Sequence, residues 1–189
     1  MNTAGLSCST TPHNEQNVTS AGVDFSSFPS IQKGAKDTVV FIGCYDCDYS
    51  RKAYPDILKI VKNKSANFIF AHYPAKGDTT FLEEAGYCVY KEYGDRYWNF
   101  NEYLLSADKD YVNTKSNLPE ILAKFNFDGK KISECANSKE TSDAVQKQTE
   151  ELNKTNMYGT PTIFINGKAF VGPKPYRVYR SAINKYIFF

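Results

Sequence analysis

The sequence lacks the features that mark several large classes of protein. No apolar stretch approaches the roughly 18 residues of a membrane span. Neither charge sign dominates, because 23 Lys and Arg residues face 21 Asp and Glu residues, which leaves a net charge of +2. Nucleic-acid and anionic-membrane binders need a dense basic face, so this balance argues against both kinds of partner. The chain has only two histidines, and with no Cys/His cluster we expect neither a metal nor a cofactor.

The chain is long enough to fold without the support of disulfides or a metal ion. Its 189 residues match one globular domain, and a folded chain of this length buries roughly 70% of its unfolded surface. The cysteines are therefore available for chemistry, and the spacing between them is the evidence for their role. Met1 to Gly22 show neither the basic start nor the apolar stretch of a signal peptide, which indicates a cytosolic or an already trimmed chain. The cysteines are Cys8, Cys44, Cys47, Cys88 and Cys135.

Apolar patterning predicts a β-α-β unit near the start of the chain. Residues 1–34 are rich in Ser, Thr and Asn and predict a flexible lead-in, with a short strand near Val23–Phe25. The continuous apolar run Thr38–Gly43 predicts a strand buried on both faces. A helical spacing follows over Tyr49–Asn63, and Asn67–Tyr73 reads as a second strand. The only cysteine pair with short spacing lies between the first of these strands and the helix.

The rest of the chain divides into a helical stretch and a hairpin. From residue 80 to about residue 156 every signal is helical, beginning with the capping box Thr80-x-x-Glu83. Further helices are predicted over Leu118–Phe125, over Ile132–Ala136 and through Val145 and Leu152. Two strands joined by an Asn-Gly type I′ turn and a closing helix end the chain, over Thr162–Ile165, Lys168–Val171 and Tyr176–Tyr186.

The segment Cys44-Tyr45-Asp46-Cys47 is the first candidate for chemistry. At the start of a helix, unpaired backbone N–H groups and the helix dipole stabilise a thiolate and lower its pKa. A lone Cys-x-x-Cys also serves as half of a zinc site, so a second signal is needed. That signal is Gly159-Thr160-Pro161-Thr162 directly before the hairpin, which resembles the cis-proline loop opposite the active cysteines of thioredoxin-fold proteins.

The segment Tyr158–Lys168, with Val171-Gly172 and an amphipathic helix after it, is similar to the C-terminal third of the DsbA-like thiol:disulfide oxidoreductases. Glu84–Cys88 and Ile132–Cys135 resemble the helical insertion of that family, including its optional second cysteine pair. The resemblance covers about residues 38–187. It implies an α/β protein with a thioredoxin-like fold, with the core in residues 35–78 and 157–189 and an inserted helical subdomain in residues 79–156.

The resemblance also bears on which cysteine is the nucleophile. In family members several residues separate the strand from the nucleophile, and a proline kinks the helix eight residues beyond it. Pro55 lies eight residues after Cys47, which favours Cys47-Asp48-Tyr49-Ser50 as the active tetrad, with Ser50 in place of the resolving cysteine and Cys44 as an extra thiol. The simple Cys-x-x-Cys interpretation instead keeps Cys44 as nucleophile and Cys47 as resolver. Cys47 takes part in both.

Two further expectations concern proton chemistry. The acidic neighbours Asp46 and Asp48 raise the pKa of an adjacent thiolate and predict a weak oxidant, unless they only cap the helix. Family members often have a buried acid six residues before the nucleophile, but that position is Phe41 in one register and Thr38 in the other. Neither can relay a proton as a carboxylate does. His72, at a strand end, is interpreted as structural or solvated.

The resemblance implies an extracytoplasmic thiol:disulfide oxidoreductase, in the periplasm or cell envelope. Cys47 would form a mixed disulfide with substrate proteins, Thr160 and Pro161 would align the substrate chain, and a membrane or soluble redox partner would complete the cycle. Cys88 and Cys135 are expected to form a structural disulfide, which requires an oxidising compartment.

Two alternatives stay open. One is a glutathione-dependent enzyme of the same superfamily, because some of those have serine in the tetrad. The other is a non-catalytic thioredoxin-like binding module, including one that binds metal through Cys44 and Cys47. Leu6-Ser7-Cys8 faintly resembles the end of a lipoprotein signal, but a thiol in the N-terminal tail is the favoured interpretation of Cys8.

Overall fold

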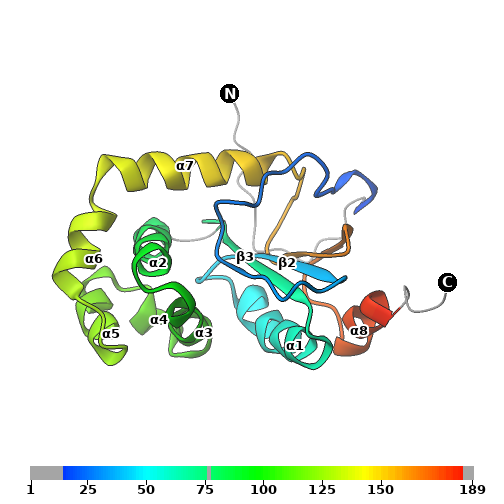
Figure 1. The fold of residues 1–189 in the computed structure, drawn as a ribbon, viewed down its shortest axis with the longest axis horizontal. Coiled ribbons are helices and arrows are strands. Elements are labelled where there is room, and N and C mark those ends of the chain that lie inside the picture. Colours follow the sequence, from blue (N-terminus) through cyan, green and yellow to red (C-terminus); the bar gives the residue numbers. More distant parts are fainter. Residues whose placement is uncertain (1–14, 76–77, 185–189) are drawn as a thin grey trace.

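A five-stranded sheet with strand order β1-β3-β2-β4-β5 forms the centre of the molecule. The computed structural model describes residues 15–75 and 78–184 (Figure 1). The central strand β2 pairs in parallel with β3 and antiparallel with β4, and the edge strands β1 and β5 also pair antiparallel. The strands are β1 (Ser30–Ile31), β2 (Thr38–Gly43), β3 (Asn67–His72), β4 (Thr162–Ile165) and β5 (Lys168–Val171).

Side chains of β2 alternate between two hydrophobic cores, because successive residues of a strand point to opposite faces. Val39 and Phe41 pack into the larger core, on the face that α1 (Asp48–Lys64) and α8 (Tyr176–Asn184) cover (Figure 1). Val40 and Ile42 pack into the smaller core on the other face. The strand is therefore buried on both sides, as its continuous apolar run predicts.

The smaller core is closed by the N-terminal segment and the end of α7 (Lys139–Asn153). Val18, Phe28 and Leu152 are all buried in it. The flexible lead-in expected over residues 1–34 is thus wrong for residues 15–34, which pack on the sheet. The short strand lies at Ser30–Ile31 and not near Val23–Phe25, because its position follows from pairing with β3 and not from local strand propensity.

Six α-helices lie between β3 and β4 in the part of the chain that the structure describes. Figure 1 shows them gathered beyond one end of the sheet, with α7 returning along its length. Cys88 on α2 and Cys135 on α6 form the disulfide that the resemblance implies. The helices are α2 (Thr80–Tyr93), α3 (Tyr97–Ser106), α4 (Lys109–Val112), α5 (Leu118–Lys124), α6 (Gly129–Ala136) and α7 (Lys139–Asn153), and single 3₁₀ turns occupy Glu15–Asn17, Gly94–Arg96 and Lys115–Asn117.

The start of α2 differs from the expected capping box. The N-cap residue is Thr79, one position earlier than predicted, and its side chain makes no capping hydrogen bond. Its hydroxyl instead lies 3.2 Å from Nε2 of His72, and the Glu83 carboxylate also faces that histidine. The side chains of Thr79 and Glu83 thus contact His72 on β3 and do not cap the helix.

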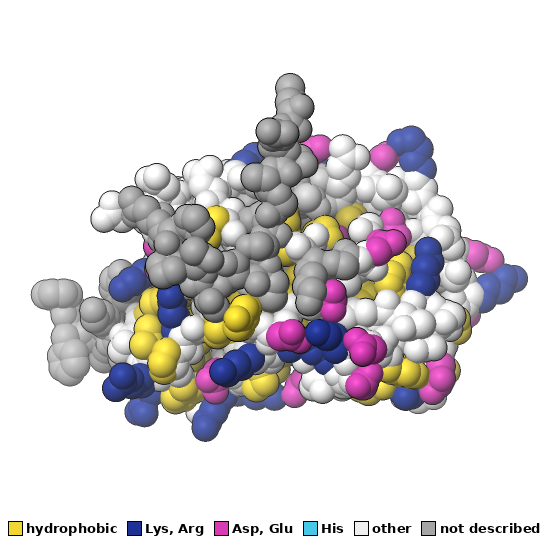
Figure 2. Space-filling view, turned by 180° about the vertical axis from the view of Figure 1, so that it is seen from behind, with side chains coloured by type: hydrophobic (Ala, Val, Ile, Leu, Met, Phe, Trp, Pro, Cys, Tyr) yellow, Lys and Arg dark blue, Asp and Glu magenta, His cyan; other side chains and the backbone are white. Residues whose placement is uncertain are grey.

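The surface agrees with the near balance of charge. Figure 2 shows Lys and Arg side chains interspersed with Asp and Glu over the face that it displays, and hydrophobic side chains are exposed between them in small groups. Within the described ranges, no helix has the length and apolar character needed to cross a membrane.

Removing the disulfide is expected to destabilise the fold. Its two cysteines are 47 residues apart, and a cross-link over such a distance contributes roughly 2–4 kcal/mol, mainly by restricting the unfolded chain. We expect the Cys88→Ser/Cys135→Ser protein to lose about that much free energy of unfolding in urea denaturation. The exposed change Glu134→Ala, next to Cys135, serves as control. Equal unfolding midpoints for wild type and double variant would contradict the prediction.

Candidate active site

Strand pairing brings three chain segments to one edge of the sheet. Gly43 at the end of β2 is paired with His72 at the end of β3, and Ile42 is paired with Thr162 at the start of β4. The turn of residues 44–47, the end of β3 and the loop before β4 therefore meet at this edge. All the candidate site residues from the sequence except the Cys88–Cys135 pair are located there.

Cys47 lies where α1 begins and faces the loop before β4. It is the N-cap residue of α1, and its Sγ lies 3.3 Å from the backbone carbonyl oxygen of Thr160. The Thr160–Pro161 peptide bond is cis. Cys47 and Thr160 are both buried. The structure thus brings Cys47, Thr160 and Pro161 together at the edge of the sheet.

Cys44 points elsewhere. Its Sγ lies 3.9 Å from the hydroxyl oxygen of Thr79, and its backbone N–H donates to Oγ of Ser50 at 3.2 Å. The turn is closed by a hydrogen bond of 3.1 Å from the Cys47 N–H to the Cys44 carbonyl. Cys47 takes part in a disulfide and Cys44 does not, so the two are not bonded to each other in this structure.

The two acidic neighbours of Cys47 both have partners from the helical insertion. Asp48 forms an ion pair of 2.9 Å with Lys109, and Oδ1 of Asp46 accepts a hydrogen bond of 3.3 Å from Asn113. The positive charge of Lys109 offsets the effect that Asp48 would have on a neighbouring thiolate. The acidic residues therefore disfavour a thiolate at Cys47 less than the sequence alone suggests.

Arg51 and Tyr45 attach the turn to the helical insertion. The Arg51 guanidinium donates to the backbone carbonyls of Tyr45, Leu104 and Ala107, the last two at the C-terminal end of α3. Cations at this end of a helix interact favourably with its dipole. The buried Tyr45 hydroxyl donates to Oδ1 of Asn101 at 2.7 Å. Burial raises the pKa of Tyr45 far above its usual range, so this side chain stays neutral.

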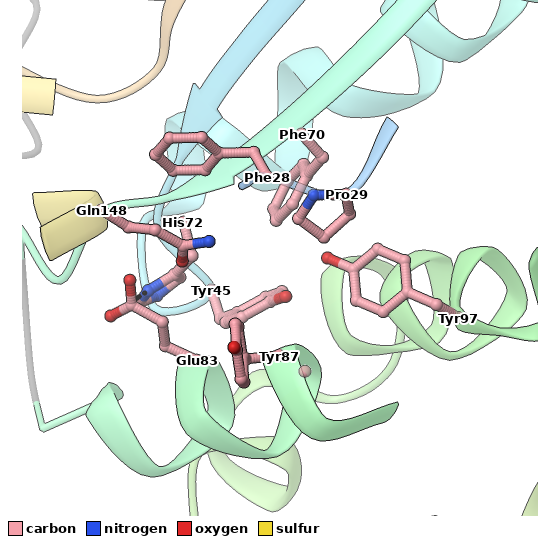
Figure 3. Close-up of a pocket in the computed structure, with 10 residues that line it drawn as sticks. Phe28, Pro29, Tyr45, Phe70, His72, Glu83, Tyr87, Tyr97 and Gln148 are labelled. Atoms are coloured by element: carbon pink, nitrogen blue, oxygen red, sulfur yellow. Dashed lines mark ion pairs between the residues drawn. The ribbon is translucent and has the colours of Figure 1, made fainter. Parts of the chain in front are cut away.

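A buried histidine and glutamate adjoin the turn. Nδ1 of His72 lies 3.3 Å from Oε2 of Glu83, and Nε2 lies 3.2 Å from the Thr79 hydroxyl. Tyr45 stacks on the imidazole with 4.6 Å between ring centroids. Figure 3 shows His72 and Glu83 side by side in a pocket that Tyr45 and Gln148 also line. The sequence expectation for His72 was a structural or solvated role, and only the fold reveals that Glu83 faces it.

The environment of His72 favours its charged form. Burial alone would lower its pKa, but the interactions with Cys44 and Glu83 outweigh that effect and raise the pKa to about 9. His72 is therefore a cation at neutral pH. Within the described part of the chain, neither carboxylate oxygen of Glu83 has a hydrogen-bond partner, so the charge of His72 is its main compensation. A cavity of about 20 Å³ beside the pair has room for one water molecule.

The positions at which the family often has a buried acid hold none. Phe41 is buried in β2 and stacked on Phe70, and Thr38 at the start of β2 donates its backbone N–H to Oδ1 of Asn166. Of the acidic side chains that the structure describes, Glu83 is the one that is buried. No group of three His, Cys, Asp or Glu side chains suited to a metal occurs among the described residues.

The sheet order and the cysteine turn opposite a proline loop define a thioredoxin fold with a helical insertion. The chain belongs to the thioredoxin family, because a family model described as thioredoxin matches residues 32–185. This confirms the family and the fold class expected from the sequence. No curated protein sequence matches the chain.

Solved structures with the same fold include three DsbA-type or related proteins. BdbD from Bacillus subtilis, in its oxidised form, is 24% identical with a TM-score of 0.71, over 85% of this chain and 91% of its own. The catalytic domain of Proteus mirabilis ScsC is 20% identical with a TM-score of 0.70, over 84% and 88%. The thiol-disulfide exchange protein alpha-DsbA2 from Wolbachia pipientis is 17% identical with a TM-score of 0.73, over 84% and 86%.

The His72 charge is expected to make stability depend on pH. Its pKa rises from 6.5 to about 9 on folding, so its contribution is complete below about pH 6.5 and is lost as pH rises through 9. The loss is at most about 3 kcal/mol. We expect the difference in unfolding free energy between wild type and His72→Gln to shrink over this pH range, measured by urea denaturation. Tyr87→Phe in the same pocket should keep the wild-type dependence, and a constant difference would refute the assignment.

Proposed function

We propose that the protein is a thiol:disulfide oxidoreductase that acts on protein thiols and disulfides through Cys47. The observation that carries this proposal is the position of the Cys47 sulfur, at the N-cap residue of α1 and 3.3 Å from the Thr160 carbonyl. Helix starts favour thiolates because their N–H groups and dipole are positive. The backbone of Thr160, beside the cis peptide bond to Pro161, is suited to hydrogen bond with a substrate chain laid beside Cys47.

The register of the turn supports Cys47 and not Cys44 as the exchanging sulfur. β2 ends at Gly43, and the turn of residues 44–47 separates it from α1. Cys44 thus precedes the helix by a whole turn, whereas Cys47 is its N-cap residue. Ser50 lies inside α1, where its hydroxyl accepts from the Cys44 N–H. A hydroxyl does not exchange with a disulfide, so Cys44 is the second thiol of the reaction.

The exchange proceeds through a mixed disulfide. A substrate thiolate attacks the Cys47 sulfur in its oxidised form, a new S–S bond forms, and the sulfur previously bonded to Cys47 leaves as a thiolate. The reverse direction uses a Cys47 thiolate and a substrate disulfide. Cys47 is buried, so the reaction requires that its sulfur be uncovered for a protein substrate.

The disulfide between α2 and α6 bears on where the protein works. Disulfides such as Cys88–Cys135 persist in oxidising compartments and are rare in a reducing cytosol. We therefore place the protein outside the cytoplasm, in the periplasm or cell envelope. Its partners there are substrate proteins with thiols or disulfides and a membrane-bound or soluble redox partner. The description of alpha-DsbA2 as a thiol-disulfide exchange protein is in keeping with this proposal.

Cysteine variants test the assignment. Cys47→Ser should form no mixed disulfide with a model dithiol or its disulfide, because the exchanging sulfur is gone. Cys44→Ser should form the adduct but release it about tenfold or more slowly, since no second thiol is at hand to resolve it. Adducts are identified by mass spectrometry after acid quenching. A stable adduct on Cys44 in the Cys47→Ser protein would reverse the roles of the two cysteines.

Ser50→Ala provides the matched control. It removes a buried hydrogen bond to Cys44 and should lower stability by about 1–3 kcal/mol without preventing adduct formation. The same assay with glutathione as the added thiol separates a glutathione-dependent enzyme from one that exchanges with protein dithiols. If no variant and no wild-type protein exchanges with either reagent, the proposal fails in favour of a binding module.

A further inference from the structure

The buried side chains beside Cys44 form a continuous polar chain that ends in a charged pair. The Cys44 sulfur lies 3.9 Å from the Thr79 hydroxyl oxygen, which lies 3.2 Å from Nε2 of His72. Nδ1 of His72 lies 3.3 Å from Oε2 of Glu83. None of the four is more than 5% exposed. Burial of a charged pair is costly, because the attraction between the charges often does not repay their desolvation. Among the described residues, this charged pair meets a reactive atom at the Cys44 sulfur, both through Thr79 and by a direct interaction of His72 with Cys44.

We propose that His72, kept charged by Glu83, stabilises the thiolate of Cys44, directly and through the Thr79 hydroxyl, and so makes Cys44 the group that releases substrate from Cys47. This inference rests on the proposed function of Cys47. His72 and Glu83 are positioning residues in this scheme, because they act through the Cys44 sulfur and not on the bond between Cys47 and the substrate. Thr79 donates its hydroxyl hydrogen to the Cys44 sulfur and accepts from the Nε2–H of His72.

The geometry of the turn allows the step. The hydrogen bond from Cys47 N–H to Cys44 carbonyl closes a four-residue turn, in which the end Cα atoms lie within about 7 Å. Disulfides span Cα distances up to about 6.8 Å, so rotation of the two side chains with a small backbone adjustment brings the sulfurs together. The Cys44 thiolate attacks the Cys47 sulfur of the mixed disulfide, the Cys44–Cys47 bond forms, and the Cys47–substrate bond breaks. The substrate sulfur leaves with the electron pair and takes a proton from water.

The other groups near His72 do not supply a positive charge that could replace the charge of His72. The titratable groups that face it are Cys44 and Tyr45 from the turn and Glu83 from α2, and Tyr45 stays neutral because burial raises its pKa. Gln148 from α7 and Tyr87 from α2 line the same pocket. Tyr87 is therefore a suitable position for a control, since Tyr87→Phe changes the pocket without touching the polar chain.

The first measurement needs no substrate. In protein with Cys8→Ser and Cys47→Ser, and with the Cys88–Cys135 disulfide intact, Cys44 is the single thiol, and its ultraviolet thiolate absorbance is followed against pH. Adding His72→Gln or Thr79→Val should move the absorbance midpoint to higher pH, whereas Thr79→Ser and Tyr87→Phe should leave it in place. Circular dichroism verifies that each variant folds. If His72→Gln does not fold, Thr79→Val, which keeps the shape of the side chain, provides the test. An unchanged midpoint in both would overturn the inference while leaving the function of Cys47 intact.

The second measurement follows release of a model substrate from the Cys47 adduct. Each pH unit of midpoint shift reduces the thiolate fraction tenfold, partly offset by higher nucleophilicity, so we expect release at pH 7 to slow about three- to tenfold in His72→Gln. The difference in release rate between wild type and His72→Gln should disappear above about pH 10, where the Cys44 thiol ionises without the charge of His72. A deficit that is equal at all pH values would indicate a merely structural role and refute the proposal. Failure of every protein to form the adduct would instead refute the function of Cys47.

Discussion

The pairing of β2 with two neighbours of opposite direction determines where every candidate site residue lies. Because β3 runs parallel to β2, the end of β3 and the cysteine turn share one edge of the sheet, and because β4 runs antiparallel, its start lies at the same edge. Residues from three distant parts of the sequence thus meet without any direct contact being specified locally. A one-residue slip of register would send the apolar side chains of β2 to the wrong faces and separate Cys47 from Thr160.

The site combines two sulfurs in contrasting surroundings. Cys47 lies at a helix start beside a backbone carbonyl, and Cys44 lies beside a hydroxyl backed by a buried cation. A buried pair such as His72 and Glu83 costs free energy to desolvate, and a hydrophobic replacement of similar volume is often as stable. Its location next to Cys44 is in keeping with the proposed role in sulfur chemistry.

The sequence predicts most of the fold and part of the site. The uninterrupted apolar runs fix β2 and β3, and the Asn-Gly turn between β4 and β5 has both residues at positive φ, as a type I′ turn requires. Spacing to Pro55 correctly sets Cys47 at the helix start. The polar chain behind Cys44 was missed because Thr79, His72 and Glu83 come together only through tertiary packing. A Thr-x-x-Glu pattern looks the same in sequence whether the glutamate caps its own helix or faces a histidine on a strand.

Arg51 gives the cysteine turn a mechanical connection to the rest of the molecule. One planar guanidinium holds the carbonyl of Tyr45 in the turn and two carbonyls at the end of α3, a geometry that an ammonium group does not reproduce. The turn and the insertion are in this way joined by hydrogen bonds, while Cys47 faces the separate loop before β4. Force applied to the insertion, for instance by a polypeptide bound across it, is then transmitted by the Arg51 guanidinium to the backbone between the two sulfurs.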